Sequence, residues 1–344
     1  MKKLIVIPFL FVFVLSCQSD ESKQNKPDNN NTPLVVGYYP LWKELYSPQW
    51  EKLTHLCLAF GIVQSDGSLN IINIEKHRSI IESAHNNKVK VLLSIGGGGG
   101  ISQNFSEAVM NVNSRNKLID NLEKALIDLN LDGIDIDFEE WEGGHAGATD
   151  KDLKKRDALE DTYKSLRQRL GDNKLITAAV AACNNNSGWG YYNCYNSTMH
   201  QYLDFAFLMI YDKTGPWPGA TVGPHSDWDF FEQSINHWLN VKKLPKEKLV
   251  AGVPFYGYTF LYPNSSEGAK DIAYREILLK YPNDEPHLKD NVGLTFYDGM
   301  NTIKRKTEFV VKNNLGGIMI WEITLDTDDQ SKSLLNTIHN VIKP

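Results

Sequence analysis

Three acidic residues alternate with apolar residues in one short segment, which reads Asp, Ile, Asp, Phe, Glu over residues 135–139. Successive side chains of a β-strand point to opposite faces, so Asp135, Asp137 and Glu139 would share one face and the apolar residues the other. A solvated edge strand would carry polar residues on both faces. Three carboxyl groups on a buried face repel one another and lose hydration, so the pattern favours acid–base chemistry over a purely structural role.

Glu139 is the best candidate for a proton donor in this segment. Crowding raises the pKa of at least one carboxyl group, and a raised pKa keeps a carboxylic acid protonated near neutral pH, as a general acid requires. Glu139 has the longest side chain of the three and lies nearest the carboxyl end of the strand. Clustered carboxylates also suit a hard cation. The sequence has no HExxH motif or matching histidine cluster, so we expect neither a metal nor another cofactor.

The rest of the chain supplies a scaffold for this strand. Short runs of apolar and β-branched residues alternate with amphipathic segments, which indicates βα units around a parallel sheet. Apolar residues recur at helical spacing over 118–129 and over 159–170, where Gly171 ends the run. We predict strands over residues 34–39, 54–60, 89–95, 133–138, 175–181, 205–211, 249–256 and 316–322.

Eight such strands, with a helical segment in most intervals, predict an α/β fold of the (β/α)₈ or TIM barrel type. Chemistry in such barrels gathers at the carboxyl ends of the strands, where Glu139 lies. No repeat, low-complexity block or linker interrupts residues 33–344, so we predict a single catalytic domain there.

The sequence resembles glycoside hydrolase family 18, and the resemblance covers residues 33–344. It rests on four groups of motifs. These are DxxDxDxE at Asp132, Asp135, Asp137 and Glu139; SxGG at Ser94, Gly96 and Gly97; MxYD at Met209, Tyr211 and Asp212; and a loop with Gly215, Trp217 and Gly223, together with segments 252–257 and 316–321.

The resemblance implies a retaining glycosidase that uses the 2-acetamido group of its substrate as nucleophile. Glu139 would protonate the departing oxygen, Asp137 would hold the acetamido N–H, and Asp135 would share a proton with Asp137. Tyr211 would help to position the acetamido group. The expected catalytic residues are therefore Asp135, Asp137, Glu139 and Tyr211, and the expected substrate-binding residues are Tyr38, Gly97, Met209, Asp212, Trp217 and Trp321, with Trp321 as the floor of the central subsite.

Other features bear on substrate preference. The sequence departs from the family pattern at Glu140 and Trp141, where many members have Tyr and Pro, and at Tyr258, where many have Arg. The interval 258–315 is too short for the full α+β insertion domain of many processive members, which favours a shallow groove and endo-type cleavage. Further candidate sugar contacts are Trp141, Trp189, Tyr191 and Tyr192.

We expect a chitinase that acts on chitin or chitooligosaccharides. Two alternatives stay open: an endo-β-N-acetylglucosaminidase that cleaves the chitobiose core of N-glycans, and a non-catalytic glycan-binding relative, which would have lost the acid at Glu139. A role as partner subunit in a surface glycan-uptake system is compatible with enzymatic activity. The net charge of −6 and the lack of a long basic run argue against a nucleic-acid partner, and we expect a monomer.

The amino terminus resembles an export signal of a bacterial lipoprotein. Lys2 and Lys3 precede an apolar run over residues 4–15 that is too short to span a bilayer. The segment 14–17 resembles a lipoprotein cleavage box. We predict a signal peptide over 1–16, lipidation of Cys17 and a flexible polar tether over 17–32, hence an exported protein anchored by lipid to a bacterial membrane, in the cell envelope or at the cell surface.

The three remaining cysteines fall into two groups. Cys57 lies inside an apolar strand and is expected in the core. Cys183 and Cys194 share one loop and can form a disulfide in an oxidising compartment, although sequence alone does not fix the pairing.

Overall fold

The computed structural model describes residues 32–43, 46–98, 100, 104–143, 148–182 and 194–343. The predicted signal peptide, Cys17 and nearly all of the tether lie outside these residues, and so do Cys183, Trp189, Tyr191 and Tyr192. Cys194 is a buried free cysteine, so the structure does not contain the bridge to Cys183 that the sequence left possible. Within the described ranges, no helix has the length and apolar character needed to cross a membrane.

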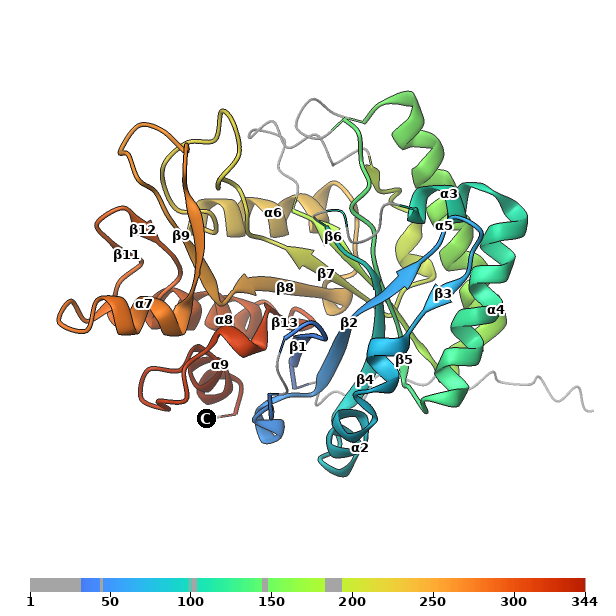
Figure 1. The fold of residues 1–344 in the computed structure, drawn as a ribbon, viewed down its shortest axis with the longest axis horizontal. Coiled ribbons are helices and arrows are strands. Elements are labelled where there is room, and N and C mark those ends of the chain that lie inside the picture. Colours follow the sequence, from blue (N-terminus) through green and yellow to red (C-terminus); the bar gives the residue numbers. More distant parts are fainter. Residues whose placement is uncertain are drawn as a thin grey trace, which may run out of the picture. The chain divides into compact units, whose positions relative to one another are not determined.

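Eight parallel strands close into a barrel, which confirms the predicted fold class (Figure 1). Strands β13 and β1 pair in parallel, and β1 also pairs with β2, which closes the ring. Each strand lies within a few residues of its predicted bounds. The barrel strands are β1 (Leu34–Pro40), β2 (His55–Val63), β4 (Lys90–Gly96), β5 (Gly133–Asp137), β6 (Leu175–Ala181), β7 (Phe205–Met209), β8 (Leu249–Pro254) and β13 (Gly317–Trp321).

Helices cover the outer face of the barrel (Figure 1). Local sequence sets their ends: α5 begins at a capping box in which the side chains of Thr149 and Asp152 each accept a backbone N–H of the other, and it ends at Gly171. The helices are α1 (Ile72–Glu75), α2 (Arg78–Asn86), α3 (Phe105–Met110), α4 (Val112–Asp128), α5 (Asp150–Leu170), α6 (Trp228–Asn240), α7 (Tyr274–Lys280), α8 (Met300–Lys312) and α9 (Leu334–Ile342).

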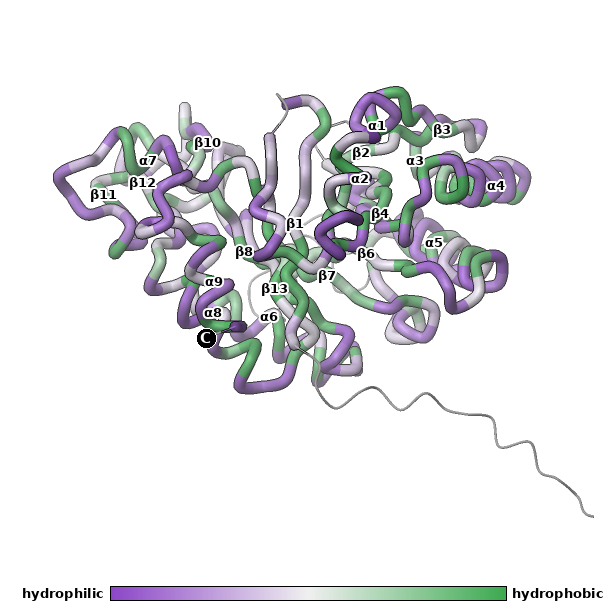
Figure 2. Tube along the Cα trace, turned by 90° about the horizontal axis from the view of Figure 1, so that it is seen from below, coloured by the Kyte–Doolittle hydropathy of each residue, from purple (hydrophilic) through white to green (hydrophobic). Residues whose placement is uncertain are grey.

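Strand alternation produces two apolar layers. Outward-facing residues such as Ile134, Ile136 and Phe138 pack between the barrel and the helices, whereas inward-facing residues such as Cys57 and Met319 fill the interior. Cys57 is thus a core residue, as predicted. Figure 2 shows hydrophobic stretches along central strands such as β13 and hydrophilic stretches along the outer helices. A polar side chain on the inner face of a barrel strand is therefore surrounded by protein.

The segment between β8 and α8, residues 255–299, forms an insert that consists of a small antiparallel sheet and helix α7. Its strands are β9 (Tyr256–Thr259), β10 (Lys270–Ala273), β11 (Asn291–Val292) and β12 (Thr295–Phe296), in the order β10-β9-β12-β11. This compact insert fits the expectation that the interval does not hold a full insertion domain, but the sequence analysis did not predict its strands. A further short strand, β3 (Leu69–Asn70), pairs with β2.

Barrel closure depends on Gly317, at the start of β13. Its φ is 155°, and an added Cβ would lie 2.3 Å from the carbonyl oxygen of Leu34 on β1. We expect Gly317→Ala to lower the free energy of unfolding by about 2–4 kcal/mol, from backbone strain and overpacking together. Gly171→Ala is a suitable control because it also has a positive φ, 59°, but no atom lies within 4 Å of its added Cβ. Urea unfolding that ranks the two variants equally would contradict the role in closure.

Candidate active site

Strand β5 carries the predicted row of acidic residues. Asp135 and Asp137 are buried on its inner face, and Glu139 follows the strand at its carboxyl end. Asp132, the first residue of the same motif, lies at the opposite end, where its carboxylate accepts the backbone N–H of Val91 at 2.7 Å and contacts His85 at 2.9 Å. Only the last three carboxyl groups of the motif therefore belong to the site.

Asp135 is held by hydroxyl groups from three neighbouring strands. Tyr38 on β1 and Ser94 on β4 donate to Oδ2 at 2.7 and 2.6 Å, and Thr177 on β6 donates to Oδ1 at 2.7 Å. Burial raises the pKa of Asp135, and these hydrogen bonds oppose the rise. Three donors and no acceptor suit a carboxylate, so we assign the negative charge of the buried pair to Asp135.

Asp137 has the opposite environment. Its Oδ1 is buried and accepts no hydrogen bond from the described residues. Burial raises the pKa of Asp137 well above its usual value, and the charges of Glu139 and Asp135 raise it further. Asp137 is therefore the member of the pair that holds the proton when the site is empty. Its unpartnered oxygen is available to a polar group of a ligand.

Glu139 has the properties of a general acid. The residue is exposed to solvent at the end of the strand, but the protein around its carboxyl group and the charge of Asp212 raise its pKa to about 7. The backbone N–H of Gly98 donates to the carboxylate and opposes this rise. Gly98 also lies close enough that an added Cβ would meet Glu139 Oε1 at 2.8 Å. A carboxyl group with this pKa is protonated in a large fraction of molecules near neutral pH.

Asp212 faces the same site from the loop after β7. Its Oδ1 accepts hydrogen bonds from Tyr256 at 2.5 Å and from Tyr258 at 2.8 Å. Its neighbour Tyr211 is buried, and the hydroxyl of Tyr211 donates to the sulfur of Met319 at 3.8 Å. Because a thioether is a weak acceptor, the Tyr211 hydroxyl can readily exchange this partner for a ligand oxygen.

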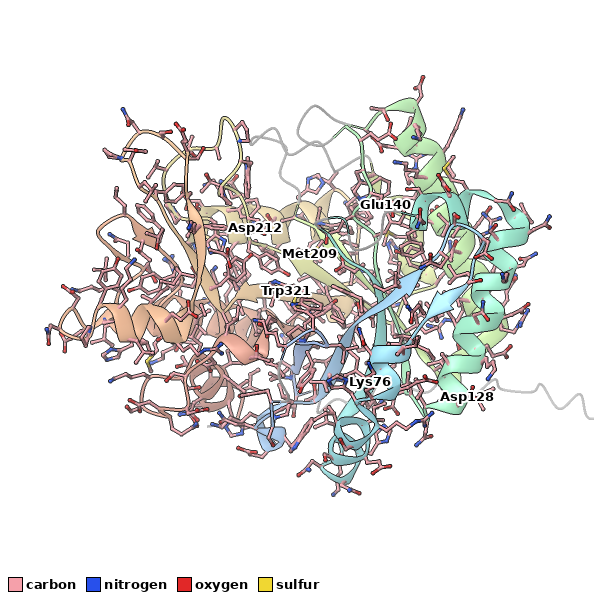
Figure 3. The ribbon with its side chains drawn as sticks, viewed as in Figure 1. Lys76, Asp128, Glu140, Met209, Asp212 and Trp321 are labelled. Carbon is pink, nitrogen blue, oxygen red and sulfur yellow. The ribbon has the colours of Figure 1, made fainter. Side chains whose placement is uncertain are left out.

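Aromatic rings form the next wall of the site. The Trp321 ring centroid lies 5.5 Å from that of Tyr38 and 5.9 Å from that of Phe60, which is stacked on it. Trp42 stacks on Phe60 in turn and is 53% exposed. In Figure 3, Asp212, Met209 and Trp321 lie near the middle of the view. Flat apolar rings beside carboxyl groups suit the apolar face of a sugar ring.

A cavity of about 560 Å³ adjoins Asp212 and the aromatic wall. It contains Asp212, Tyr256, Tyr258 and Trp321, and its far wall comes from the insert through Asp271 and neighbouring residues. A larger cavity of about 850 Å³ lies between α7 and residues 324–332. Asp135, Asp137 and Glu139 line neither cavity, but Asp212 and Trp321 line the smaller one, so we place the site beside it.

Comparison with known proteins identifies the family. Residues 34–326 match the model of the glycosyl hydrolases family 18. The chain belongs to this family. A chitinase from Bacteroides thetaiotaomicron has a similar structure, with 30% identity, a TM-score of 0.77, and coverage of 90% of this chain and 96% of that one. The family 18 chitinase ChiB from the chitin utilization locus of Flavobacterium johnsoniae is also 30% identical, with a TM-score of 0.73 and coverage of 91% and 94%.

Curated relatives of this glycosidase are matched over part of their length. A chitinase-like effector of Moniliophthora roreri is 29% identical over 74% of this chain and 66% of its own length. Probable chitinase 10 of Drosophila melanogaster is 25% identical over 87% of this chain but only 15% of its own length. The names include both chitinases and chitinase-like proteins, so the family fixes the glycosidase fold and not the substrate.

The structure assigns different positions to the predicted sugar contacts of this family 18 chain. Tyr38 is only 1% exposed, within β1 and not in a loop, and its hydroxyl supports Asp135, so direct sugar contact by Tyr38 stays a prediction. Gly97 packs against Phe60, where an added Cβ would lie 2.6 Å from the ring. Trp217 lies edge-on to Tyr258, with ring centroids 6.2 Å apart.

Glu140 and Trp141 point away from the catalytic row. The Glu140 carboxylate accepts the backbone N–H groups of Phe105 and Ser106 at 2.9 and 2.8 Å and so caps α3. Figure 3 shows Glu140 on the side of α3. The Trp141 ring packs edge-on against Phe138, 4.7 Å away, in the outer apolar layer. Trp141 thus packs in the outer layer and away from the acidic row, and a sugar contact by Trp141 stays a prediction.

Sequence reasoning missed several residues that support the site. Thr177 contacts Asp135, and His225 and Tyr256 contact Asp212; none of the three was predicted. Tyr258 was noted only as a departure from the family. Alternation along β6 would have placed Thr177 on the inner face as the one polar residue of its run. No local signal connects His225 or Tyr256 with Asp212.

Proposed function

We propose that this family 18 glycosidase is a chitinase that cleaves internal β-1,4 bonds between the N-acetylglucosamine units of its polymeric substrate. The observation that carries the proposal is the inner-face row of Asp135, Asp137 and Glu139, in which Glu139 has a pKa of about 7. Trp321 beside this row supplies a platform for a sugar ring, and the similar structures named above are chitinases. The short insert favours endo-type cleavage because it leaves the groove shallow.

In the first step, the acetamido carbonyl oxygen of the bound sugar attacks its anomeric carbon. The bond from that carbon to the glycosidic oxygen breaks, and Glu139 transfers its proton to the leaving oxygen. The product is a cyclic oxazolinium ion. Asp137 accepts the acetamido N–H through its free oxygen and, by passing its own proton toward Asp135, balances the positive charge. Tyr211 and the open side of Asp212 hold the acetamido group in line.

In the second step, water attacks the anomeric carbon from the face that the leaving group vacated. The Glu139 carboxylate removes a proton from this water, and the oxazolinium ring opens to restore the acetamido group. The configuration at the anomeric carbon is retained, and Glu139 returns to its protonated state.

We also propose that the protein is exported and anchored by lipid at Cys17, as its amino-terminal sequence predicts. A surface enzyme with a polar tether would reach polymeric substrate outside the cell.

Hydrolysis of chitotetraose beside a high-mannose glycoprotein tests the function directly. A chitinase releases shorter chitooligosaccharides, and mass spectrometry of early products from a longer oligomer shows cuts at several internal bonds. Release of the N-glycan alone would assign the site to the chitobiose core instead. Binding without any cleavage would support a glycan-binding role, and dimer released only from one chain end would contradict endo-type cleavage.

The pH dependence follows from the pKa of Glu139, about 7. Only the protonated acid donates, so we expect kcat/KM for chitotetraose to fall about tenfold per pH unit above about pH 7. Initial rates measured from pH 4 to 9 give this alkaline limb of the pH profile. Thermal unfolding at the same pH values controls for loss of fold. A limb two units lower, in a protein that stays folded, would contradict the assignment of Glu139 as the acid.

A further inference from the structure

We propose that His225 and the buried Lys306–Asp298 ion pair behind it form a positioning network that holds Asp212 against the substrate. The inference rests on the proposed function, because it concerns how the catalytic loop after β7 is kept in place. The network connects this loop with α8 and with the insert.

The inner part of the network is the contact between His225 and Asp212. His225 is 1% exposed, and its Nδ1 lies 3.3 Å from the backbone N of Asp212 and 3.2 Å from Asp212 Oδ1. Nε2 lies 3.2 Å from the carbonyl oxygen of Tyr256. The ring sits between those of Tyr256 and Tyr258, at 4.9 Å from each. A neutral ring with Nε2 protonated donates to Tyr256 and accepts the N–H of Asp212.

Asp212 needs such support because its backbone has a φ of 59°, which non-glycine residues rarely adopt. Among the described residues, Tyr256 and Tyr258 donate hydrogen bonds to the Asp212 carboxylate, and both bonds go to Oδ1. The other oxygen is left for the substrate. Rotation of this side chain would exchange the two oxygens and spoil the contact with the acetamido group.

The outer part of the network fixes the residue after His225. The hydroxyl of Ser226 donates to the carbonyl oxygen of Ile210 at 2.6 Å and accepts from Lys306 Nζ at 2.8 Å. Lys306 also donates to the carbonyl oxygen of Ser226 and forms an ion pair with Asp298 at 2.6 Å. Ser226 therefore joins the end of β7, just before Tyr211 and Asp212, to an amine on α8.

Stability alone is a poor explanation for this ion pair. Lys306 is 0% and Asp298 4% exposed, and burying two charges costs about as much as their attraction returns. The pair instead fixes orientation, since one ammonium group holds the hydroxyl and the carbonyl oxygen of Ser226 and a carboxylate from the insert. The loop that carries His225 is thereby fixed against two separate elements.

The network has an electrostatic readout at Glu139. The groups that face Glu139 are Asp137 from β5, Asp212 and Tyr211 from the loop after β7, and the N–H of Gly98 after β4. Asp212 raises the pKa of Glu139. If Asp212 moves away, that pKa falls, so the alkaline limb of the pH profile moves to lower pH. A residue that merely stabilised the fold would leave the limb in place.

His225→Phe and His225→Asn separate shape from hydrogen bonding. Phe keeps the ring between the two tyrosines but accepts nothing, whereas Asn offers an oxygen to the N–H of Asp212. We expect His225→Phe to lower kcat on chitotetraose about 10- to 100-fold with little change in KM, and to move the limb to lower pH. His225→Asn should recover part of both effects.

The double variant Lys306→Met/Asp298→Asn tests the outer part without leaving an unpaired buried charge. We expect a Tm close to that of the wild type, together with a lower kcat and a limb at lower pH. Lys248→Met is the matched control, because Lys248 also donates to two backbone carbonyls but lies at the amino end of β8. It should change Tm and leave the limb unchanged.

Three results decide the inference. An unchanged limb and kcat in both His225→Phe and the double variant, in an active enzyme, would overturn the network and leave the proposed function standing. A limb that moves in Lys248→Met as well would also overturn it. A folded wild-type protein that does not cut chitotetraose would overturn the proposed function itself.

Discussion

Replacement of Glu139 by Gln is expected to lower kcat on chitotetraose by about 10²–10⁴-fold, with KM nearly unchanged. Gln has almost the same shape and can still accept the backbone N–H of Gly98, but it has no proton to give to the leaving oxygen and no charge to activate water. The groups that bind the sugar, including Trp321 and Asp212, stay in place. Product release measured by chromatography over hours, at equal concentrations of folded protein, gives the ratio.

The neighbouring Glu140→Gln variant is the matched control. Glu140 carries the same chemistry one position along the chain, but its carboxylate caps α3 through Phe105 and Ser106. We expect full activity and a loss of about 1 kcal/mol in the free energy of unfolding. Equal losses of activity in the two variants would mean that the defect is structural and that Glu139 is not the acid.

The part of the site that sequence predicts is the part that lies on one strand. Side chains of a strand alternate strictly, so Asp135 and Asp137 had to share a face. The apolar residues of the strand predicted which face packs against the helices outside the barrel. The structure confirms this, because Ile134 and Ile136 pack under the helices while both aspartates point inward. The barrel was predictable for a related reason, since eight strand-like runs with helical spacing between them leave few other arrangements.

Alternation fails at Trp141, four residues beyond the end of β5. Glu140 lies on the outer side, as alternation from Phe138 requires, and meets the free N–H groups of α3, but Trp141 packs in the outer layer as well because the chain turns there. Nothing in the local sequence announces this turn. The capping contact joins residues 34 and 35 positions apart.

The support of Asp212 was hidden for a different reason. Its partners Tyr256 and Tyr258 stand 44 and 46 residues away in the sequence and come from the insert, whose strands are two to four residues long. Strands this short carry too little periodicity to be recognised. Tyr38 shows the same limit, because its aromatic ring suggested a sugar contact while its hydroxyl supports Asp135 from inside the barrel.

Asp137→Ala is expected to separate activity from stability. The oxazolinium intermediate loses the group that accepts its N–H and balances its charge, so kcat on chitotetraose should fall about 10²–10³-fold. Asp137 is also a buried carboxyl group with an unpartnered oxygen, which costs about 1–3 kcal/mol in the resting protein. We therefore expect the free energy of unfolding, measured in urea, to stay level or rise even as activity collapses.

Asp132→Asn should show the reverse pattern, because Asp132 belongs to the same motif but lies at the other end of β5. Its carboxylate accepts the N–H of Val91 and contacts His85, and Asn keeps only part of this bonding. We expect a loss of about 1 kcal/mol in stability with kcat unchanged. If Asp137→Ala were instead the less stable of the two, and its activity fell only as far as its folded fraction, Asp137 would be a structural residue. Asp137→Ala should thus keep or gain stability, whereas Asp132→Asn should lose it. This contrast is expected if the binding site is destabilising until the substrate binds.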